Sequence, residues 1–402
     1  MKKRAKRFLV FGFISMSCLV AADVNASREI EYRPYVRVAG EYNDNILFAR
    51  EDEQDDFLAN IVPGLKLDYR TELLDLKSEG KILFKRYLQE DDFDREEYWG
   101  DLRARYRITE KLMMRGRFNY RQDNTLESTQ LDFDEPIDLP ADDVIDPGIE
   151  RFYSERKRTN VYAAVQYQLT ELSELDLLCR YLNTRYDFEG NTDSEIYGIS
   201  PTFLTRLAGQ RDVVGARGGY AQYSSDRSDA DIYEIALIWD HRFTETMTLE
   251  SELGASYVDR TYHRDERQED EWAGLADIRL ILHGESTLAK IGFKQNYQPG
   301  SSGEAVNVPR FYGEIEQNIT ERFQARCKWD LYLESEEADF GYDDGNVFFD
   351  VVPSLRYRLT KDYSISLAYS YTIDYDQDRD DNRDKQRNRV WLALEFGFPG
   401  KW

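Results

Sequence analysis

The sequence lacks any long apolar run after its N-terminal segment. Beyond residue 26, no stretch approaches the roughly 18 unbroken apolar residues that a membrane-spanning helix requires. Histidine is scarce, with three residues, and no nucleophile motif, zinc-ligand spacing or phosphate-binding loop is present. We therefore expect no helical anchor, no enzyme activity and no catalytic residues, and neither a cofactor nor a bound metal.

Basic residues are also in deficit. The 53 Lys and Arg face 77 Asp and Glu, giving a formal net charge of −24, which argues against nucleic acid as a partner. The mean hydropathy of −0.69 would suit a soluble protein, but a membrane β-barrel needs apolar residues only at every second strand position. An aromatic content of 14%, together with a regular strand pattern, argues against disorder.

The chain begins with an export signal. Five basic residues between Lys2 and Arg7 precede a largely apolar run over 8–22, which ends in Val24-Asn25-Ala26. This pattern predicts a signal peptide over 1–26, cleaved near Ala26. A lipoprotein signal at Cys18 is disfavoured, because the apolar run continues past that cysteine. Residues 27–402 then form one exported domain.

A short turn phrase recurs along the mature chain. Its copies lie at 69–72, 108–111, 169–171, 243–245, 319–321 and 359–361, and each separates two runs of alternating apolar and polar residues. Tight turns joining alternating strands are typical of an up-and-down β-barrel. We count about 18 strands, an even number as in single-chain bacterial barrels. The predicted fold is all-β, a transmembrane antiparallel barrel.

The predicted connections are of two kinds, without exception. Tight turns follow every second strand, and longer, mostly acidic loops follow the others, at 43–56, 89–96, 122–152, 187–194, 224–231, 259–270, 298–306, 334–345 and 374–387. Short periplasmic turns and longer external loops place both termini in the periplasm. The extracellular loop 122–152 is the longest and is the candidate constriction or lid. Its acidic residues could hold calcium, although solvated acidic loops are the simpler interpretation.

Five prolines fall inside predicted strands: Pro34, Pro63, Pro201, Pro309 and Pro353. Because proline cannot donate to a strand ladder, we expect each to mark a bulge or a strand end.

If the apolar faces meet lipid, the alternate faces line the interior, and one stretch of that face is basic. Its residues are Lys77, Lys81, Lys85, Arg103, Arg105, Arg107, Arg115, Arg117, Arg121, Arg156 and Arg158. Guanidinium groups lining a pore would attract anions and favour carboxylate or phosphate. The alternative is that Asp68, Asp75, Glu79, Asp101 and the acidic loops neutralise these side chains in structural ion pairs.

Aromatic residues are also predicted on the interior faces. They are Trp99, Tyr162, Tyr186, Tyr312, Tyr332 and Trp391, and such a track could stack against sugar rings. Other tyrosines fit the interfacial girdles of any membrane barrel, namely Tyr42, Tyr98, Tyr120, Tyr257, Tyr357 and Tyr363.

The start of the mature chain resembles the opening of the beta-barrel porin 2 family. The resemblance lies in residues 35–46, where a first strand runs into Tyr42-Asn43-Asp44-Asn45, and it continues as repeated hairpins. Members of that family are often associated with exopolysaccharide synthesis and export. The resemblance therefore implies an outer-membrane channel for polymer export, and it brings no catalytic residues.

These observations predict an outer-membrane channel, a conduit for secreted polysaccharide through a partly basic lumen. Its expected partners are outer-membrane lipid and lipopolysaccharide, the polysaccharide and a periplasmic export apparatus. Two alternatives stay open: a general diffusion porin, and a non-conducting structural or adhesive barrel that displays acidic loops.

Overall fold

The computed structural model describes residues 29–125, 154–188, 191–207, 209, 211–264, 266–299, 304–337, 343–376 and 384–401. The predicted signal peptide lies outside these ranges, and so does the predicted loop 122–152 apart from its first four residues. The predictions made for these two segments therefore stay predictions.

The described residues form eighteen long strands and one short one. Their bounds are β1 (Glu29–Asn43), β2 (Asp56–Arg70), β3 (Leu74–Tyr87), β4 (Arg95–Arg107), β5 (Leu112–Asn124), β6 (Glu155–Gln168), β7 (Ser173–Tyr186), β8 (Ser194–Arg206), β9 (Asp212–Ser225), β10 (Ser228–Arg242), β11 (Met247–Tyr262), β12 (Gln268–His283), β13 (Thr287–Pro299), β14 (Ala305–Asn318), β15 (Phe323–Glu337), β16 (Asp343–Arg358), β17 (Tyr363–Asp376), β18 (Lys385–Gly397) and β19 (Gly400–Lys401). A single 3-10 turn, η1 (Asp91–Phe93), lies between β3 and β4 in this part of the chain. No helix in these ranges is long and apolar enough to cross a membrane.

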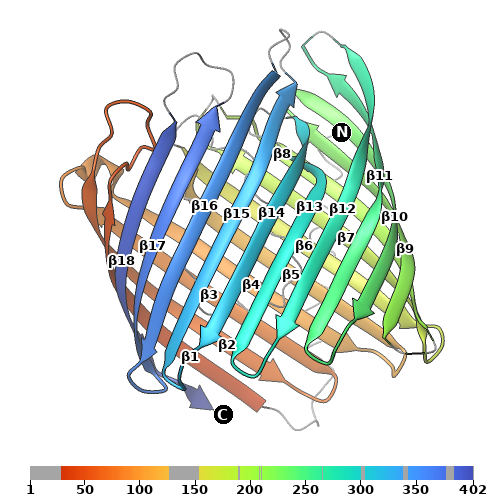
Figure 1. Cartoon of the computed structure of the whole chain (residues 1–402), viewed down its shortest axis with the longest axis horizontal. Coiled ribbons are helices and arrows are strands. Elements are labelled where there is room, and N and C mark those ends of the chain that lie inside the picture. Colours follow the sequence, from red (N-terminus) through yellow and green to blue (C-terminus); the bar gives the residue numbers. More distant parts are fainter. Residues whose placement is uncertain are drawn as a thin grey trace.

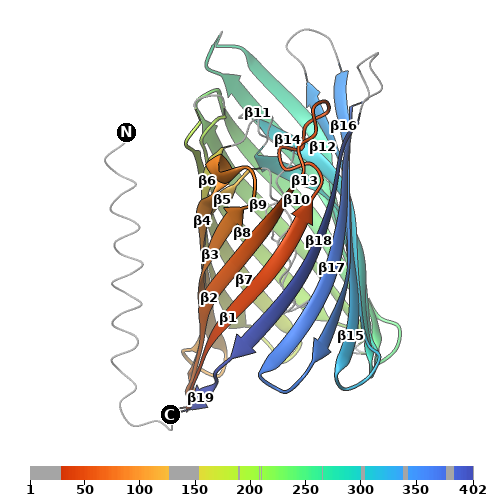
Figure 2. The same ribbon diagram turned by 90° about the vertical axis from the view of Figure 1, so that its left-hand side faces the viewer.

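The strands close into one antiparallel barrel (Figures 1 and 2). Each long strand pairs with its sequence neighbours, and β1 closes the barrel by pairing with both β2 and β18. At the closure, Ala39 lies opposite Ala393, and β19 adds a short pairing of Glu31 with Lys401. The predicted fold class is thus confirmed.

Alternation along each strand separates an apolar face from a polar face. In β10, Ile235 and Leu237 are strongly exposed, whereas Glu234 and Ala236, between and beside them, are not. Cross-strand partners share a face, and the register keeps this assignment from strand to strand around the whole barrel. In a closed barrel one face lies outside and the other inside, so the exposed apolar face is the outer one.

Threonine side chains explain the recurring turn phrase. Thr109 Oγ1 accepts hydrogen bonds from the backbone N–H groups of Lys111 and Leu112, at 3.2 and 3.0 Å. The same two bonds recur at Thr71, Thr170, Thr320 and Thr360. A hydroxyl that caps two N–H groups mimics a backbone turn, so the phrase encodes a tight connection.

One predicted loop is wrong. Residues 224–231 were expected to form a longer loop, but β9 and β10 extend through them and leave only Asp226 and Arg227 as a turn. Ser225 Oγ closes this turn by accepting the N–H groups of Arg227 and Ser228, at 3.1 and 2.9 Å. The separation into tight and long connections therefore has an exception. The neighbouring acidic residues lie on strand ends, where the outer face need not be apolar.

The strand prolines do not mark bulges, contrary to expectation. Pro353 pairs with Cys327 of β15, while the β16–β17 ladder skips from Val351 to Ser354 without a change of register. Pro63 and Pro201 interrupt one ladder in the same way, and Pro34 and Pro309 precede the first pair of one ladder. On one side of each proline, the strand ladder therefore has no residue pair that would need the N–H group that proline lacks. The register continues past this gap, so no bulge residue is inserted.

Aromatic rings form a band on the outer face near the long-loop end. Tyr220, Tyr233, Tyr257 and Trp272, from β9 to β12, contact one another in sequence, with ring centroids 5.1–6.3 Å apart. Such rings suit the boundary between lipid and water. Tyr257 of the predicted girdle belongs to this band.

Candidate functional site: the interior wall

The strand register places all eleven predicted basic residues on the inner face. They lie on four adjacent strands, β3 to β6, and are brought together as cross-strand neighbours. Arg103 lies opposite Arg117, and Arg105 lies opposite Arg115. Like charges directly opposite each other destabilise a sheet, and nearby carboxylates offset part of that cost: Asp75 of β3 lies opposite Arg105.

The part of this wall nearer the long loops is locked in buried ion pairs. Arg156 donates to both oxygens of Asp123 at 3.1 Å, and both side chains are fully buried. Arg121 and Arg158 contact the same carboxylate, at 2.5 and 3.3 Å. One acid thus serves three arginines, and these side chains hold the wall together.

Carboxylates of β4 also hold neighbouring cations. Glu97 lies 3.7 Å from Lys85 and 3.0 Å from Arg95, and all three are largely buried. The Asp101 carboxylate likewise contacts two of the predicted arginines, with Arg103 Nε at 2.6 Å and Arg117 Nε at 2.7 Å. The alternative of structural ion pairs therefore accounts for part of the wall.

The part nearer the tight turns is different. Lys77, Arg105 and Arg107 are exposed on the inner face, and none of them forms an ion pair within the described residues. Arg115 beside them is exposed too and pairs with Asp176 of β7. On β3 to β6, these four are the exposed cations of the inner face.

The inner face of β3 to β6 has a net positive charge. Arg95 joins the eleven predicted cations, and the carboxylates of the same face are Asp75, Glu79, Glu97, Asp101 and Asp123. We call this surface the basic wall. Acids are too few to neutralise it, so the net charge of −24 must be carried elsewhere in the chain.

Further around the barrel the charge is reversed. On β9 to β12 the inner face has the carboxylates Glu234, Asp240, Glu250, Glu252, Glu269, Glu271 and Asp277 against Arg217, Arg242, Arg260 and Arg279. Arg217 contacts Glu234 at 2.9 Å and also Glu252. We call this surface the acidic wall. A polar group between the two walls would experience an electric field directed from the basic wall to the acidic wall.

The predicted interior aromatics are on the inner face, and three of the six, Trp99, Tyr312 and Trp391, lie against cations. Lys81 Nζ lies 4.4 Å from the Trp99 ring centroid. Arg310 and Lys290 lie over Tyr312, at 5.0 and 5.6 Å. Arg389 lies 4.8 Å from the Trp391 ring centroid. The ring of Tyr332 stacks on that of Phe348, with centroids 4.6 Å apart. Tyr162 and Tyr186 face inward on β6 and β7. Because Tyr312, Tyr332 and Trp391 are buried, they form no open stacking track.

The sequence-based prediction did not include several inner-face arginines, among them Arg95, Arg387 and Arg389. The last two lie on β18, where they alternate with outward residues and precede Trp391 on the same face. The alternating pattern of residues 387–391 is a usable sequence signal for the last two.

The Asn-Asp-Asn phrase after β1 ties the first loop across the barrel closure. Asn45 is fully buried, and its amide donates to the carbonyls of Ala49 at 2.7 Å and Gln386 at 2.9 Å. Asp44 accepts the backbone N–H of Asn388 at 2.6 Å. The loop thereby places the buried Phe48 ring 4.9 Å from the Arg387 guanidinium.

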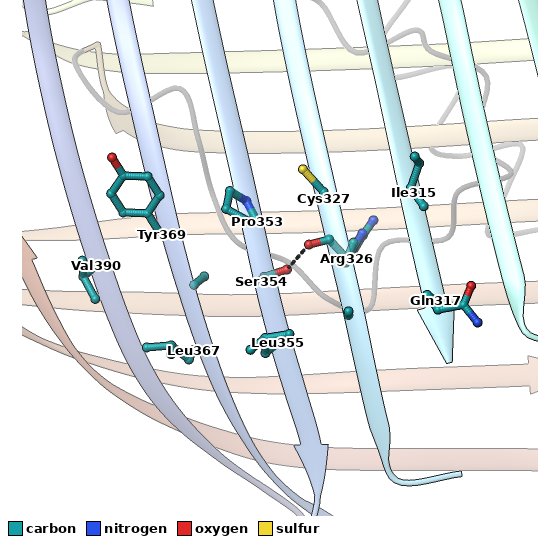
Figure 3. Close-up of a pocket in the computed structure, with 12 residues that line it drawn as sticks. Ile315, Gln317, Arg326, Cys327, Pro353, Ser354, Leu355, Leu367, Tyr369 and Val390 are labelled. Carbon is teal, nitrogen blue, oxygen red and sulfur yellow. Dashed lines mark hydrogen bonds between the residues drawn. The ribbon is translucent and has the colours of Figure 1, made fainter. Parts of the chain in front are cut away.

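An apolar groove of about 500 Å³ lies outside this interior, across β14 to β18 (Figure 3). Cys327, Pro353, Leu355, Leu367 and Tyr369 line it, all on the outer face of the register. The groove borders the ladder gap at Pro353 and belongs to the apolar exterior.

The histidines make simple pairs. His241 Nδ1 lies 2.7 Å from Asp212, and His263 Nε2 lies 3.1 Å from Asp229. A hydrogen bond to the Asp229 carboxylate, followed by one to the Asp226 carbonyl, raises the pKa of His263 above its ordinary 6.5. In the described ranges no group of three or more His, Cys, Asp or Glu is placed to hold a metal.

Comparisons with known proteins give similarity in three dimensions only. No family model matches the sequence, and no curated protein does. Among solved structures, the chain is similar to the outer membrane protein OpdK of Pseudomonas aeruginosa (TM-score 0.47, 9% identity, 94% of this chain and 99% of that one). It is also similar to the outer membrane channel DcaP (TM-score 0.44, 13% identity, 92% and 98%) and to OccAB4 (TM-score 0.47, 10% identity, 94% and 99%), both of Acinetobacter baumannii.

Proposed function

We propose that this protein is an outer-membrane channel that passes hydrophilic solutes and favours anions. A closed barrel with an apolar outer face and a charged inner face suits a bilayer with an aqueous interior. The tight-turn end, where β1 begins and β18 ends, faces the periplasm in this proposal, and the long loops face outward.

The observation that carries the preference for anions is the exposed part of the basic wall. Lys77, Arg105 and Arg107 have no ion-pair partner among the described residues, and Arg105 lies opposite a further arginine, Arg115. Placing like charges side by side costs stability, and nearby carboxylates offset part of that cost. Accessible guanidinium groups attract anions while binding them loosely enough for release.

A conduit for secreted polysaccharide is the narrower form of this proposal. It is supported by the resemblance of residues 35–46 to the beta-barrel porin 2 family and by the aromatic residues of the inner face. The burial of Tyr312, Tyr332 and Trp391 counts against sugar stacking at those rings. Lipopolysaccharide and a periplasmic export apparatus remain the partners that this form requires.

The test is conductance in a planar bilayer with a salt gradient, using refolded full-length protein. We expect discrete steps and a reversal potential on the anion side. The variant K77Q/R105Q/R107Q should move that potential toward cations. The control R86Q/K157Q/R185Q removes the same charge from residues on the outer face and should move it much less.

Two results would overturn the proposal at different levels. Absence of steps from protein shown to be folded would exclude the channel and favour a structural or adhesive barrel. Steps with unchanged selectivity in K77Q/R105Q/R107Q would leave a general diffusion porin. Block of the current by an anionic polymer such as polygalacturonate, and not by a neutral dextran of equal size, would support the polysaccharide form.

A further inference from the structure

A pair of arginines on β18 lies outside the basic wall described above. Arg387 and Arg389 face inward with Trp391, and the register sets Arg389 opposite Asn43 of β1 and Ser370 of β17. Each arginine side chain is only 2% exposed. Both are therefore withdrawn from bulk water at the barrel closure, where buried charge needs a compensating partner.

Each of these two guanidinium groups lies over an aromatic ring. The Arg389 Cζ atom lies 4.8 Å from the Trp391 ring centroid, and the Arg387 Cζ atom lies 4.9 Å from that of Phe48. A ring attracts the cation through its face and accepts no in-plane N–H bond. The ring contact thus restrains each guanidinium and uses none of its N–H donors, which stay available to a ligand.

The edge of Arg389 carries donors that are not used. Its Nε and Nη2 atoms are buried and have no hydrogen-bond partner among the described residues. These two nitrogens form one side of the guanidinium fork, the side that matches the two oxygens of a carboxylate. The nearby carboxylate of Asp350 does not fill this place, because its Oδ1 accepts the hydroxyls of Thr372 and Ser370, at 2.6 and 3.2 Å.

The net charge of the neighbouring side chains indicates which ligand charge this site would favour. The cations that interact with each other here are Lys85, Arg95, Arg387 and Arg389, and the anions are Glu41, Glu97 and Asp350. Asp330 also acts on Asp350, but Arg310 binds Asp330 through two hydrogen bonds and balances its charge. The four cations and three anions then leave an excess of one positive charge. A monoanion would balance it, whereas a phosphate dianion would add charge beside Asp350 and Glu41.

We propose that the Nε–Nη2 edge of Arg389 is a binding site for the carboxylate group of a small monocarboxylate solute. The proposal rests on the proposed channel function, since the solute reaches the site through the barrel. Phe48 and Trp391 act as positioning residues, because each ring lies against one of the two guanidinium groups. Arg387 supplies a second positive charge beside the ligand.

Binding is measured apart from conduction, with full-length protein refolded in detergent. Acetate is titrated at constant ionic strength against chloride, and the tryptophan fluorescence is followed. We expect a saturable change that is absent in W391F, since Arg389 lies on that ring. In R389Q the acetate affinity should fall about tenfold or more, because a two-donor charged contact is lost.

The matched control is R86Q, which removes an arginine of the outer face and should leave acetate binding unchanged. R389K keeps the positive charge but not the two-donor edge, so its affinity for acetate should also fall. If R389Q does not fold, R389K is used in its place. The proposal would be overturned if R389Q or R389K bound acetate as tightly as wild type. It would also be overturned if wild type bound the methylphosphonate dianion more tightly than acetate. Binding without conductance would refute the channel alone, and conductance without saturable binding would refute this site alone.

Discussion

Arg156 and Asp123 form a two-bond ion pair that is sealed from solvent, with both N–O distances at 3.1 Å. The carboxylate also holds Arg121 and Arg158. Breaking a buried pair by removing one partner leaves uncompensated charge, at a cost of about 3–5 kcal/mol. We therefore expect D123N to destabilise the barrel by about that amount, measured by urea unfolding in lipid vesicles.

The control for this prediction is R158Q. Asp123 would keep two of its three arginines in that variant, so the loss of stability should be much smaller. A D123N protein with wild-type unfolding free energy would contradict the view that Asp123 holds this part of the basic wall together.

The capped turns should add stability in small, separate amounts. Replacing threonine by valine keeps the side-chain shape but removes the hydroxyl that accepts two N–H groups. We expect about 0.5–1 kcal/mol per turn, because the freed N–H groups can bind water. The variant T109V/T170V/T320V/T360V should sum these losses, since the turns are separate. The measurement is the urea midpoint, with serine at the same four positions as the control that restores the cap.

The acidic wall should oppose the basic wall in ion selectivity. The variant E250Q/E252Q removes two inner-face carboxylates, which leaves Arg217 and Arg279 less compensated. The reversal potential in a salt gradient should then move further toward anions, and the shift should shrink at high salt as the charges are screened. The control E96Q/E155Q removes two carboxylates of the outer face. Equal shifts for both pairs would show that net charge, not its location inside, sets selectivity.

Much of the fold could be predicted because an apolar outer face and a polar inner face impose a period of two on the strands. The turn at Asp226 and Arg227 could not, because the strands there extend beyond the apolar band and their outer faces turn acidic. The alternating pattern also predicts that Arg389 lies on the inner face. It does not predict the neighbours of Arg389, because only closure of the barrel brings Phe48 and Asn43 to β18. Which carboxylate serves which arginine depends on register, as the sharing of Asp123 shows. Sequence alone therefore indicated a basic surface, but not which of its cations are free to meet a solute.

The pair of His263 and Asp229 should make the long-loop end weakly sensitive to pH. The folded-state pKa of His263 is raised above the ordinary 6.5, so the pair stabilises the folded loop fully below pH 6.5. That contribution is lost as the pH rises through the raised pKa, when the imidazole becomes neutral. The side chain is 41% exposed, so solvent screening keeps the effect small. An NMR titration of the histidine ring protons should give a pKa above 6.5 for His263, and D229N should lower it. A His263 pKa that is the same in wild type and D229N would mean that the ion pair does not persist in solution.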